Sequence, residues 1–188
     1  MTSAAAGVDP RPALLELLRS RAFERKRVVL ASGKESDFFI DCKQAVLTAE
    51  GHVLVGETML ASLQQLAPVE AVAGVELGGC PLASAVALTS FGRGKPLDAI
   101  YVRKDAKEHG SRRVLEGNTR IPQGARVALL EDVVTTGGST LKAAAKLRDA
   151  GYVVAGVVAL VDRLEGGREA IEAAGLALHA LFTRADFM

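Results

Sequence analysis

Apolar and polar positions alternate along the chain in blocks that are typical of an α/β protein. Short, almost uniformly apolar runs predict strands buried on both faces, and longer segments have apolar residues at helical spacing. The expected strands are residues 69–75, 97–102, 127–130, 153–161 and 176–182, and the expected helices are residues 48–66, 81–91, 138–150 and 168–174. This order predicts a parallel sheet with helices on both faces.

Two segments do not follow this alternation. After a first helix that begins near Asp9-Pro10, residues 23–42 mix charged, aromatic and β-branched residues around Gly33, which predicts a hairpin or small hood over about residues 20–45. A polar stretch over about residues 103–119 is long for a connection inside a compact domain, which indicates a functional or disordered loop. Because no repeat or interdomain linker is visible, we expect one domain over residues 1–188.

The composition disfavours several classes of partner. Of the 188 residues 49% are apolar, which is enough for one sizeable core, and the 23 basic and 22 acidic residues nearly cancel. We therefore expect neither a nucleic-acid nor a membrane partner. Cys42 and Cys80 lie far apart without metal-ligand spacing, which disfavours a disulfide scaffold or a zinc site. With no stretch typical of a secretion leader or a bilayer span, we expect a cytoplasmic protein.

An acidic pair and a glycine-rich turn follow the expected strand 127–130. Glu131-Asp132 stands at the carboxyl end of that strand, where ligands bind in open α/β sheets. The turn Thr135–Thr140 opens a helix, so its N–H groups and hydroxyls can hold a phosphate. Carboxylates repel a bare phosphate but suit sugar hydroxyls and metal-bound groups, which indicates a ligand with both features. The alternative is an ordinary capped turn beside a surface acidic pair.

The turn lacks the signatures of P-loop NTPases and dinucleotide sites. Residues Leu129–Thr140 instead resemble the 5-phosphoribosyl-1-pyrophosphate motif of type I phosphoribosyltransferases. The resemblance implies the fold of that family, a parallel sheet flanked by helices with a small N-terminal hood. It also implies that Glu131 and Asp132 hold the ribose 2- and 3-hydroxyls, with Asp132 contributing to catalysis, and that the turn holds the 5-phosphate. The donor-binding residues implied here are Glu131, Asp132, Val133, Val134, Thr135, Thr136, Gly137, Gly138 and Ser139.

A basic loop begins at the end of the expected strand 97–102. It places three cations and a histidine within residues 103–109, and cations suit a leaving pyrophosphate on which charge accumulates. The alternative is a solvated charged loop. The order Arg-Lys-x-x-Lys-x-His-Gly, however, closely resembles the catalytic loop of orotate phosphoribosyltransferases. This resemblance implies pyrophosphate contacts from Arg103, Lys104, Lys107 and His109, with Lys107 and Arg103 catalytic. It also implies a homodimer, because in that family the loop closes over the partner's active site.

Two further segments resemble the part of these enzymes that recognises orotate. The hood sequence places Phe38 and Phe39 near the base, with Phe39 as the closer match, although two core phenylalanines are the alternative. Asp162-Arg163 resembles the pair whose arginine binds the orotate carboxylate, and Thr135 would donate a hydrogen bond nearby. A surface ion pair is the alternative for Asp162-Arg163.

The chain departs from the family pattern at two positions. Ala31 and Gly78 stand where some members carry a lysine, and backbone N–H groups at Gly78-Gly79 could replace one of these contacts.

Taken together, the resemblance implies transfer of the phosphoribosyl group to orotate, which gives orotidine 5'-monophosphate and pyrophosphate in pyrimidine biosynthesis. It implies Mg²⁺ bound mainly through the donor, and we assign no residue as a direct metal ligand. Two alternatives stay open: a phosphoribosyltransferase for a purine or another pyrimidine, and a non-catalytic regulator on the same fold. The regulator would carry a basic face or an added DNA-binding segment, and the near-neutral charge favours neither.

Overall fold

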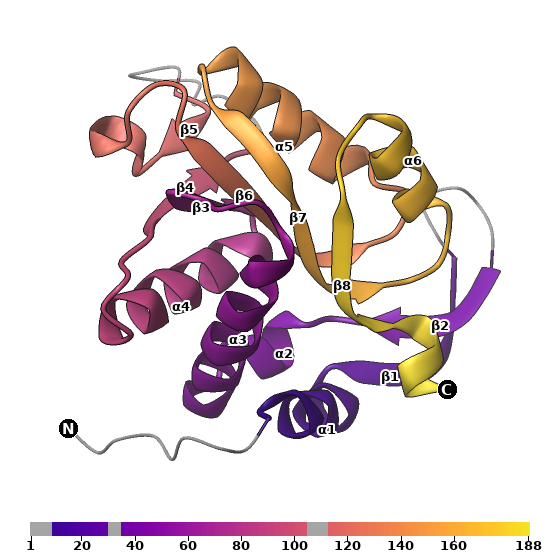
Figure 1. Ribbon diagram of the computed structural model, residues 1–188. Helices are drawn as coiled ribbons and strands as arrows, with labels where there is room; N and C mark the ends of the chain where they lie inside the picture. Colours follow the sequence, from indigo (N-terminus) through magenta and orange to yellow (C-terminus); the bar gives the residue numbers. More distant parts are fainter. Residues whose placement is uncertain (1–8, 30–34, 105–112) are drawn as a thin grey trace.

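The computed structural model describes residues 9–29, 35–104 and 113–188. It shows a six-stranded sheet with helices on both faces and a separate two-stranded hairpin (Figure 1). The strands follow the order β5-β4-β3-β6-β7-β8, and all pair in parallel except β5, which is antiparallel to β4. They are β3 (Ala71–Val75), β4 (Asp98–Val102), β5 (Leu115–Glu116), β6 (Arg126–Val134), β7 (Val153–Asp162) and β8 (Leu178–Thr183). The predicted parallel α/β architecture is therefore confirmed.

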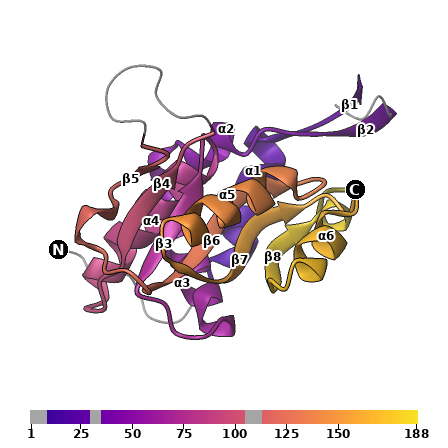
Figure 2. The ribbon, with the colours of Figure 1, turned by 90° about the horizontal axis from the view of Figure 1, so that it is seen from above.

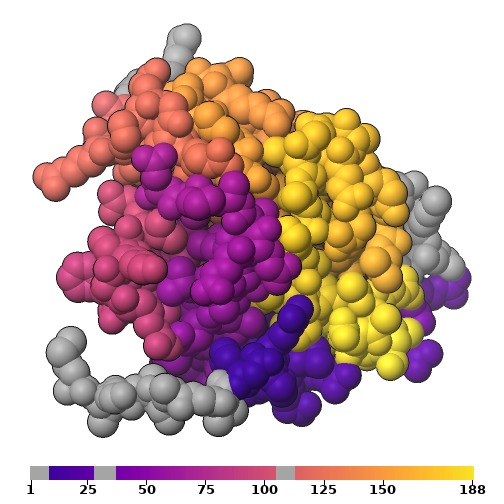
Figure 3. Space-filling model, in the orientation of Figure 1, coloured from indigo at the N-terminus to yellow at the C-terminus, as the bar shows by residue number. Residues whose placement is uncertain are grey.

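Two pairs of helices cover the sheet. Helices α3 (Ala49–Ser62) and α4 (Gly79–Gly92) lie side by side on one face, where they form a continuous surface (Figure 3). Helices α5 (Gly138–Asp149) and α6 (Gly167–Ala173) lie on the other face. The predicted start of α3 is confirmed, because the Thr48 hydroxyl caps it by accepting from the amide of Gly51 at 2.9 Å. The helix ends earlier than predicted, at Ser62, and a 3₁₀ turn Leu63–Gln65 follows.

Strand β6 lies between two hydrophobic cores. Ala128 and Leu130 pack with α3 and α4, whereas Val127 and Leu129 pack with α5, and none of the four is exposed. Because successive strand residues point to opposite faces, burial on both sides requires an unbroken apolar run. This is the reason that the sequence of β6 shows no polar alternation.

The carboxyl end of β6 lies further along the chain than predicted. The expected strand stopped at Leu130, but β6 continues to Val134, and its pairing with β7 includes Glu131 opposite Ala159 and Val133 opposite Val161. Apolar periodicity missed this end because functional polar residues replace apolar ones there. The acidic pair therefore belongs to the strand, and its two side chains point to opposite faces of the sheet.

The polar stretch that was expected to form a loop to Thr119 is partly regular. Leu115–Glu116 forms β5 at the edge of the sheet, and a 3₁₀ turn Asn118–Arg120 follows. Leu115 is buried and anchors this return to the sheet. A strand of two residues is too short to produce a readable alternation.

The predicted hood is confirmed as an antiparallel hairpin of β1 (Phe23–Val29) and β2 (Glu35–Ile40), which projects from the body (Figure 2). It lies between helices α1 (Arg11–Arg21) and α2 (Lys43–Val46) in the sequence. The ring of Phe38 is fully buried against Phe23 and Phe187, at centroid distances of 5.1 and 5.8 Å. The hairpin is thus fixed to the body by an aromatic cluster.

Among the described residues, no helix is long and apolar enough to cross a membrane.

The packing of β6 gives a test of stability. We expect Leu130→Ala to lower the free energy of unfolding by about 2–5 kcal/mol, because the truncation leaves a cavity between the sheet and α4. Urea denaturation followed by circular dichroism measures the change. Val153→Ala, at the half-exposed start of β7, is the matched control and should change stability by less than about 1 kcal/mol. Equal effects of the two substitutions would contradict the assignment of β6 to the core.

Candidate active site

Four neighbouring strands end at the same edge of the sheet and bring the predicted site residues together. Because β3, β4, β6 and β7 are parallel, the segments that follow them share one edge. These segments are residues 76–79, 103–104, 135–139 and 163–167, and the acidic pair lies near the carboxyl end of β6. The hairpin and α2 meet this edge from the side of Asp132 and Arg163. The arrangement brings acidic, glycine-rich and basic segments to one edge of the sheet.

Glu131 points to the α5 side and is almost fully buried, with 4% of its surface exposed. Its Oε2 accepts hydrogen bonds from Thr140 Oγ1 at 3.0 Å and Ser139 Oγ at 3.3 Å, in the first turn of α5. Burial, together with the nearby charge of Asp132, raises the pKa of Glu131 to about 8. A protonated carboxyl group at neutral pH can donate a hydrogen bond as well as accept one.

Asp132 points to the opposite face, towards the loop that follows β3. A Cβ atom added at Gly78 would lie only 1.9 Å from Asp132 Oδ2, so the backbone of this loop touches the carboxylate. Gly78 is the N-cap of α4, whose first amides lack partners within the helix. The peptide bond between Glu76 and Leu77 in the same loop is cis. The glycine that departs from the family pattern thus permits close approach of backbone N–H groups to the site.

A cation that sequence reasoning missed lies on the side of the site where Asp132 is found. Lys43, in α2, forms an ion pair with Asp41 at 2.5 Å. The hydrogen bond with Asp41 and the nearby charge of Asp132 raise the pKa of Lys43. The adjacent Cys42 thiol lies 3.9 Å from the carbonyl oxygen of Asp132 and is fully buried. Lys43 carried no sequence signal because its segment lies far from β6 along the chain, and only the docking of α2 brings it to the acidic pair.

The turn between β6 and α5 has the geometry expected of a phosphate site. Gly137 adopts a φ of 78°, which favours glycine, and α5 begins at the next residue. The first-turn amides of α5 therefore point into the turn at the positive end of the helix. Gly167 packs closely against the turn, because a Cβ atom at this position would lie only 2.6 Å from the carbonyl oxygen of Thr135. Thr136, Gly138 and Ser139 are exposed and accessible to a ligand.

Arg163 follows β7 and lies beside this turn, with its amide donating to the carbonyl oxygen of Val134 at 2.9 Å. Its guanidinium pairs with Glu165 at 2.9 Å and donates to the carbonyl oxygen of Phe38 at 3.2 Å. Only 11% of the side chain is exposed. Asp162 does not form the surface ion pair that was the alternative: it is buried and accepts from Arg168 Nε at 3.1 Å. Asp162 thus shapes the turn that carries Arg163.

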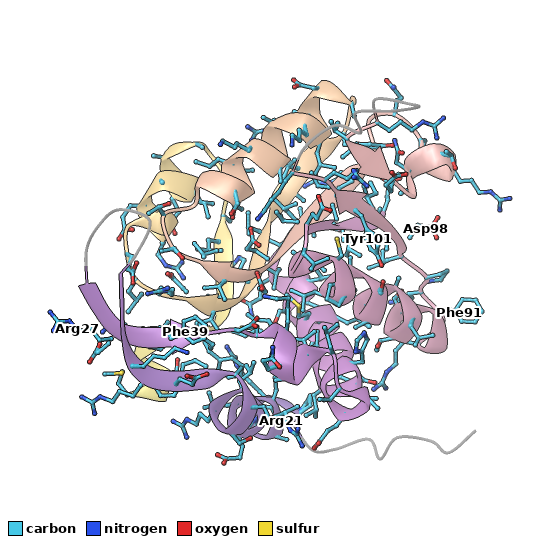
Figure 4. All side chains as sticks on the ribbon, turned by 180° about the vertical axis from the view of Figure 1, so that it is seen from behind. Arg21, Arg27, Phe39, Phe91, Asp98 and Tyr101 are labelled. Carbon is cyan, nitrogen blue, oxygen red and sulfur yellow. The ribbon has the colours of Figure 1, made fainter. Side chains whose placement is uncertain are left out.

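The two hood phenylalanines have different environments. Phe38 is fully buried, and the guanidinium of Arg163 lies 5.4 Å from its ring centroid. The expected contact of Phe38 with a nucleobase is therefore not supported, because its ring has no exposed surface. The ring instead packs against the guanidinium of Arg163. Phe39 faces the other side of the hairpin, where Lys26 Nζ lies 3.9 Å from its ring centroid (Figure 4). Phe39 is only partly buried and remains the candidate for contact with a base.

The stem of the basic loop lies at the same edge. Arg103 is paired with Glu116 of β5 at 3.8 Å, and its amide donates to the carbonyl oxygen of Val114 at 2.9 Å. Lys107 and His109 lie outside the described residues, and their expected contacts stay predictions.

Burial raises the pKa of Cys80 to about 11, which agrees with a small buried residue rather than a nucleophile.

Comparison with known proteins identifies the class. A family model described as the phosphoribosyl transferase domain matches residues 55–174, so the chain belongs to the phosphoribosyltransferases. An orotate phosphoribosyltransferase of Sorangium cellulosum (strain So ce56) is 68% identical over 184 residues, which cover 98% of this chain and 96% of the relative. Within the family, the chain therefore belongs to the orotate phosphoribosyltransferases, and the resemblance seen in the sequence is confirmed.

Solved structures agree with this grouping. The orotate phosphoribosyltransferase of Mycobacterium tuberculosis H37Rv in complex with Fe(III) dicitrate has a TM-score of 0.81 and 38% identity, and the match covers 95% of this chain and 98% of that one. The same enzyme in complex with 5-phospho-alpha-D-ribosyl 1-diphosphate has a TM-score of 0.77 and 32% identity, with 97% and 94% covered.

The buried carboxyl group of Glu131 predicts a pH dependence of stability. Its pKa lies near 8 in the folded chain and near 4.5 when unfolded, so the folded state holds a proton that the unfolded state releases. Stability from this group is therefore present at low pH and is lost as the pH rises between these values. We expect the wild type to lose on the order of 1 kcal/mol per pH unit more than Glu131→Gln between about pH 5.5 and 7.5.

Urea unfolding of both proteins at the two pH values, without ligands, measures this difference. Glu131→Gln keeps an oxygen that can accept from Thr140, so it serves as a permanently neutral version of the same side chain. Parallel stability curves for the two proteins would mean that Glu131 is ionised throughout, and would contradict the raised pKa.

Proposed function

We propose that this protein transfers the phosphoribosyl group of 5-phosphoribosyl-1-pyrophosphate to orotate, which gives orotidine 5'-monophosphate and pyrophosphate in the synthesis of pyrimidine nucleotides. The observation that carries the proposal is the meeting of Asp132, the turn before α5 and Arg163 at one edge of the sheet. These groups suit ribose hydroxyls, a 5-phosphate and a carboxylate respectively. The membership of the family supports the same assignment.

The proposed mechanism is substitution at the anomeric carbon of the donor. The turn of residues 135–139 holds the 5-phosphate through N–H groups and hydroxyls, and Asp132 accepts hydrogen bonds from the ribose hydroxyls. A ring nitrogen of orotate attacks the anomeric carbon and gives up its proton to solvent, and pyrophosphate leaves with the electron pair of the C–O bond. Positive charge develops on the ribose ring, and the carboxylate of Asp132 stabilises it. Arg103, Lys104, Lys107 and His109 neutralise the leaving group.

Orotate enters on the side of the hood in this proposal. Its carboxylate binds Arg163 in competition with Glu165, which already accepts from the guanidinium. Thr135 donates a hydrogen bond to the base, and Phe39 contacts its edge or face. Phe38 holds the guanidinium from the buried side, so the arginine is ordered before a ligand arrives.

The residues fit a magnesium ion that arrives with the donor. Among the described residues, no cluster of three or more His, Cys, Asp or Glu side chains could hold a metal ion by itself. Mg²⁺ commonly binds through substrate phosphates with one or two carboxylates, and Asp132 lies where it can contribute one. When bound, the ion would neutralise charge on the pyrophosphate group.

An apolar stripe on α4 supports a homodimer. Leu88 and Phe91 are 75% and 73% exposed, and they share one face of the helix with Ser84. Ser84 is hydrogen-bonded to Tyr101 of β4, so the surface next to these residues extends from α4 to the sheet. Exposed apolar residues of this size mark contact surfaces, and we propose that a second copy of the chain covers them.

The cytoplasm is the proposed location, since Cys42 and Cys80 are both free thiols.

A panel of bases tests the proposed substrate. Purified protein with Mg²⁺ and the donor should consume orotate and leave hypoxanthine, adenine and uracil unchanged. Consumption of another base without orotate would favour the first alternative, and donor binding without any turnover would favour the regulator.

Arg163 gives the sharper test of base recognition. We expect Arg163→Met to raise the KM for orotate by about 10-fold or more, because a charge-assisted contact is lost, with the KM for the donor changed less than about twofold. Arg184→Met is the matched control, because Arg184 also lies over the Phe38 ring, at 5.6 Å, and has no assigned role in the site. Steady-state kinetics with each substrate varied measures both values. A change confined to the donor would contradict the role of Arg163.

Mixed dimers test the sharing of the loop between subunits. Lys107→Ala and Asp132→Asn should each abolish most activity when assayed alone. If the loop serves the partner's site, a mixture allowed to exchange subunits contains dimers with one intact site, and activity returns. Mixing without recovery, although hybrid dimers are detected by mass spectrometry, would place both residues in the same subunit's site.

A further inference from the structure

Side chains from two other elements hold the backbone at the end of β4. Lys146 Nζ, in α5, donates to the carbonyl oxygens of Arg103 at 2.8 Å and of Lys104 at 2.6 Å. Glu76 Oε2, in the loop after β3, accepts from the amide of Lys104 at 2.8 Å. The amide of Arg103 pairs with Val114, as described above. All four polar backbone groups of Arg103 and Lys104 are therefore satisfied.

A cavity borders these contacts. A cavity of about 310 Å³ lies between α5 and the ends of β3 and β4, and Lys104, Ser139, Lys142 and Lys146 are among its lining residues. Across this cavity, the two hydrogen bonds of Lys146 link the stem directly to α5. Both Lys146 and Glu76 are charged, so their bonds to the backbone are stronger than neutral ones.

The contacts join the segments that carry the proposed phosphate contacts. Helix α5 provides the turn for the 5-phosphate at its N-terminus and Lys146 about two turns later, in the same rigid element. The loop after β3 provides Gly78 next to Asp132, and Glu76 two residues earlier. The peptide between Arg103 and Lys104 is thus held both by α5, which begins at the 5-phosphate turn, and by the loop that touches Asp132.

We infer that Lys146 and Glu76 are positioning residues, which hold the Arg103–Lys104 peptide so that both cations leave the strand towards the donor's pyrophosphate. The inference rests on the proposed role of Arg103 and Lys104. Among the residues that the structure describes, the side-chain hydrogen bonds of Lys146 and Glu76 go to backbone atoms of this stem. They act through the two cations rather than on the substrate.

Substitution of Lys146 tests the inference in the full-length protein. Lys146→Met keeps the aliphatic part of the side chain and removes both hydrogen bonds. We expect kcat/KM for the donor to fall about 10-fold or more. The KM for orotate should change less than about twofold, because the contacts lie on the pyrophosphate side. Lys146→Arg keeps a donor at this position and should recover most of the loss. Amide exchange at residues 103–104 should be faster in Lys146→Met and unchanged elsewhere.

Lys142→Met is the matched control for charge. Lys142 is exposed one turn earlier on α5 and lines the same cavity, and it makes no hydrogen bond with the described residues of the stem. We expect this variant to keep wild-type kinetics. An equal loss in Lys142→Met would show that only the positive charge matters, and would overturn the inference. So would an unchanged Lys146→Met, or a loss shared equally by both substrates that Lys146→Arg does not recover.

Glu76 gives an independent measurement if Lys146→Met does not fold. Glu76→Gln keeps an oxygen that accepts from the amide of Lys104, whereas Glu76→Leu does not, so the loss for the donor should be larger in Glu76→Leu. Equal kinetics of these two variants would overturn the inference. Wild-type protein that fails to use orotate at all would refute the proposed function instead, so the two failures are distinguishable.

Discussion

Strand β6 packs between two hydrophobic cores, and the geometry of the site depends on that packing. Burial on both faces fixes the direction of each side chain, so the two carboxylates at its end must diverge. Glu131 enters the α5 side and meets the hydroxyls that begin the helix. Asp132 enters the α4 side and meets the loop at Gly78. One strand thus orients a buried carboxyl group with a raised pKa and a more accessible one, and the neighbouring strands supply the remaining groups at the same edge.

The sequence predicted the architecture well because the signals were strong. Parallel strands covered on both sides require apolar runs, and Thr48 carries the chemistry of a helix cap. The end of β6 was missed because periodicity follows burial, and the acidic pair interrupts the apolar pattern while the backbone continues to pair with β7. The short strand at Leu115 was missed because it depends on a neighbour that is distant in the sequence rather than on its own pattern.

The sequence indicated the position of candidate residues that lie in motifs, and gave no signal for residues that reach the site through packing. Thr135–Ser139 and Arg163 were found by order and spacing, and they lie where expected, at the strand ends. Phe38 was assigned to the base because the motif places two aromatic residues together, but alternation in β2 sends one of them into the core. Lys43 and Lys146 gave no signal, since each reaches the site only after α2 and α5 pack on the sheet. Such contacts are properties of the tertiary structure.

The proton on Glu131 has a consequence for how ligands bind. Burial raises the pKa of this carboxyl group to about 8, so at neutral pH the folded chain binds more protons at this position than the unfolded chain does. A polyanion near the start of α5 would raise the affinity of the group for its proton, whereas a hydroxyl or a cation that needs an acceptor would favour its release. The heat of ligand binding should therefore vary with the ionisation enthalpy of the buffer. The sign of that variation would report which kind of group comes to lie against Glu131.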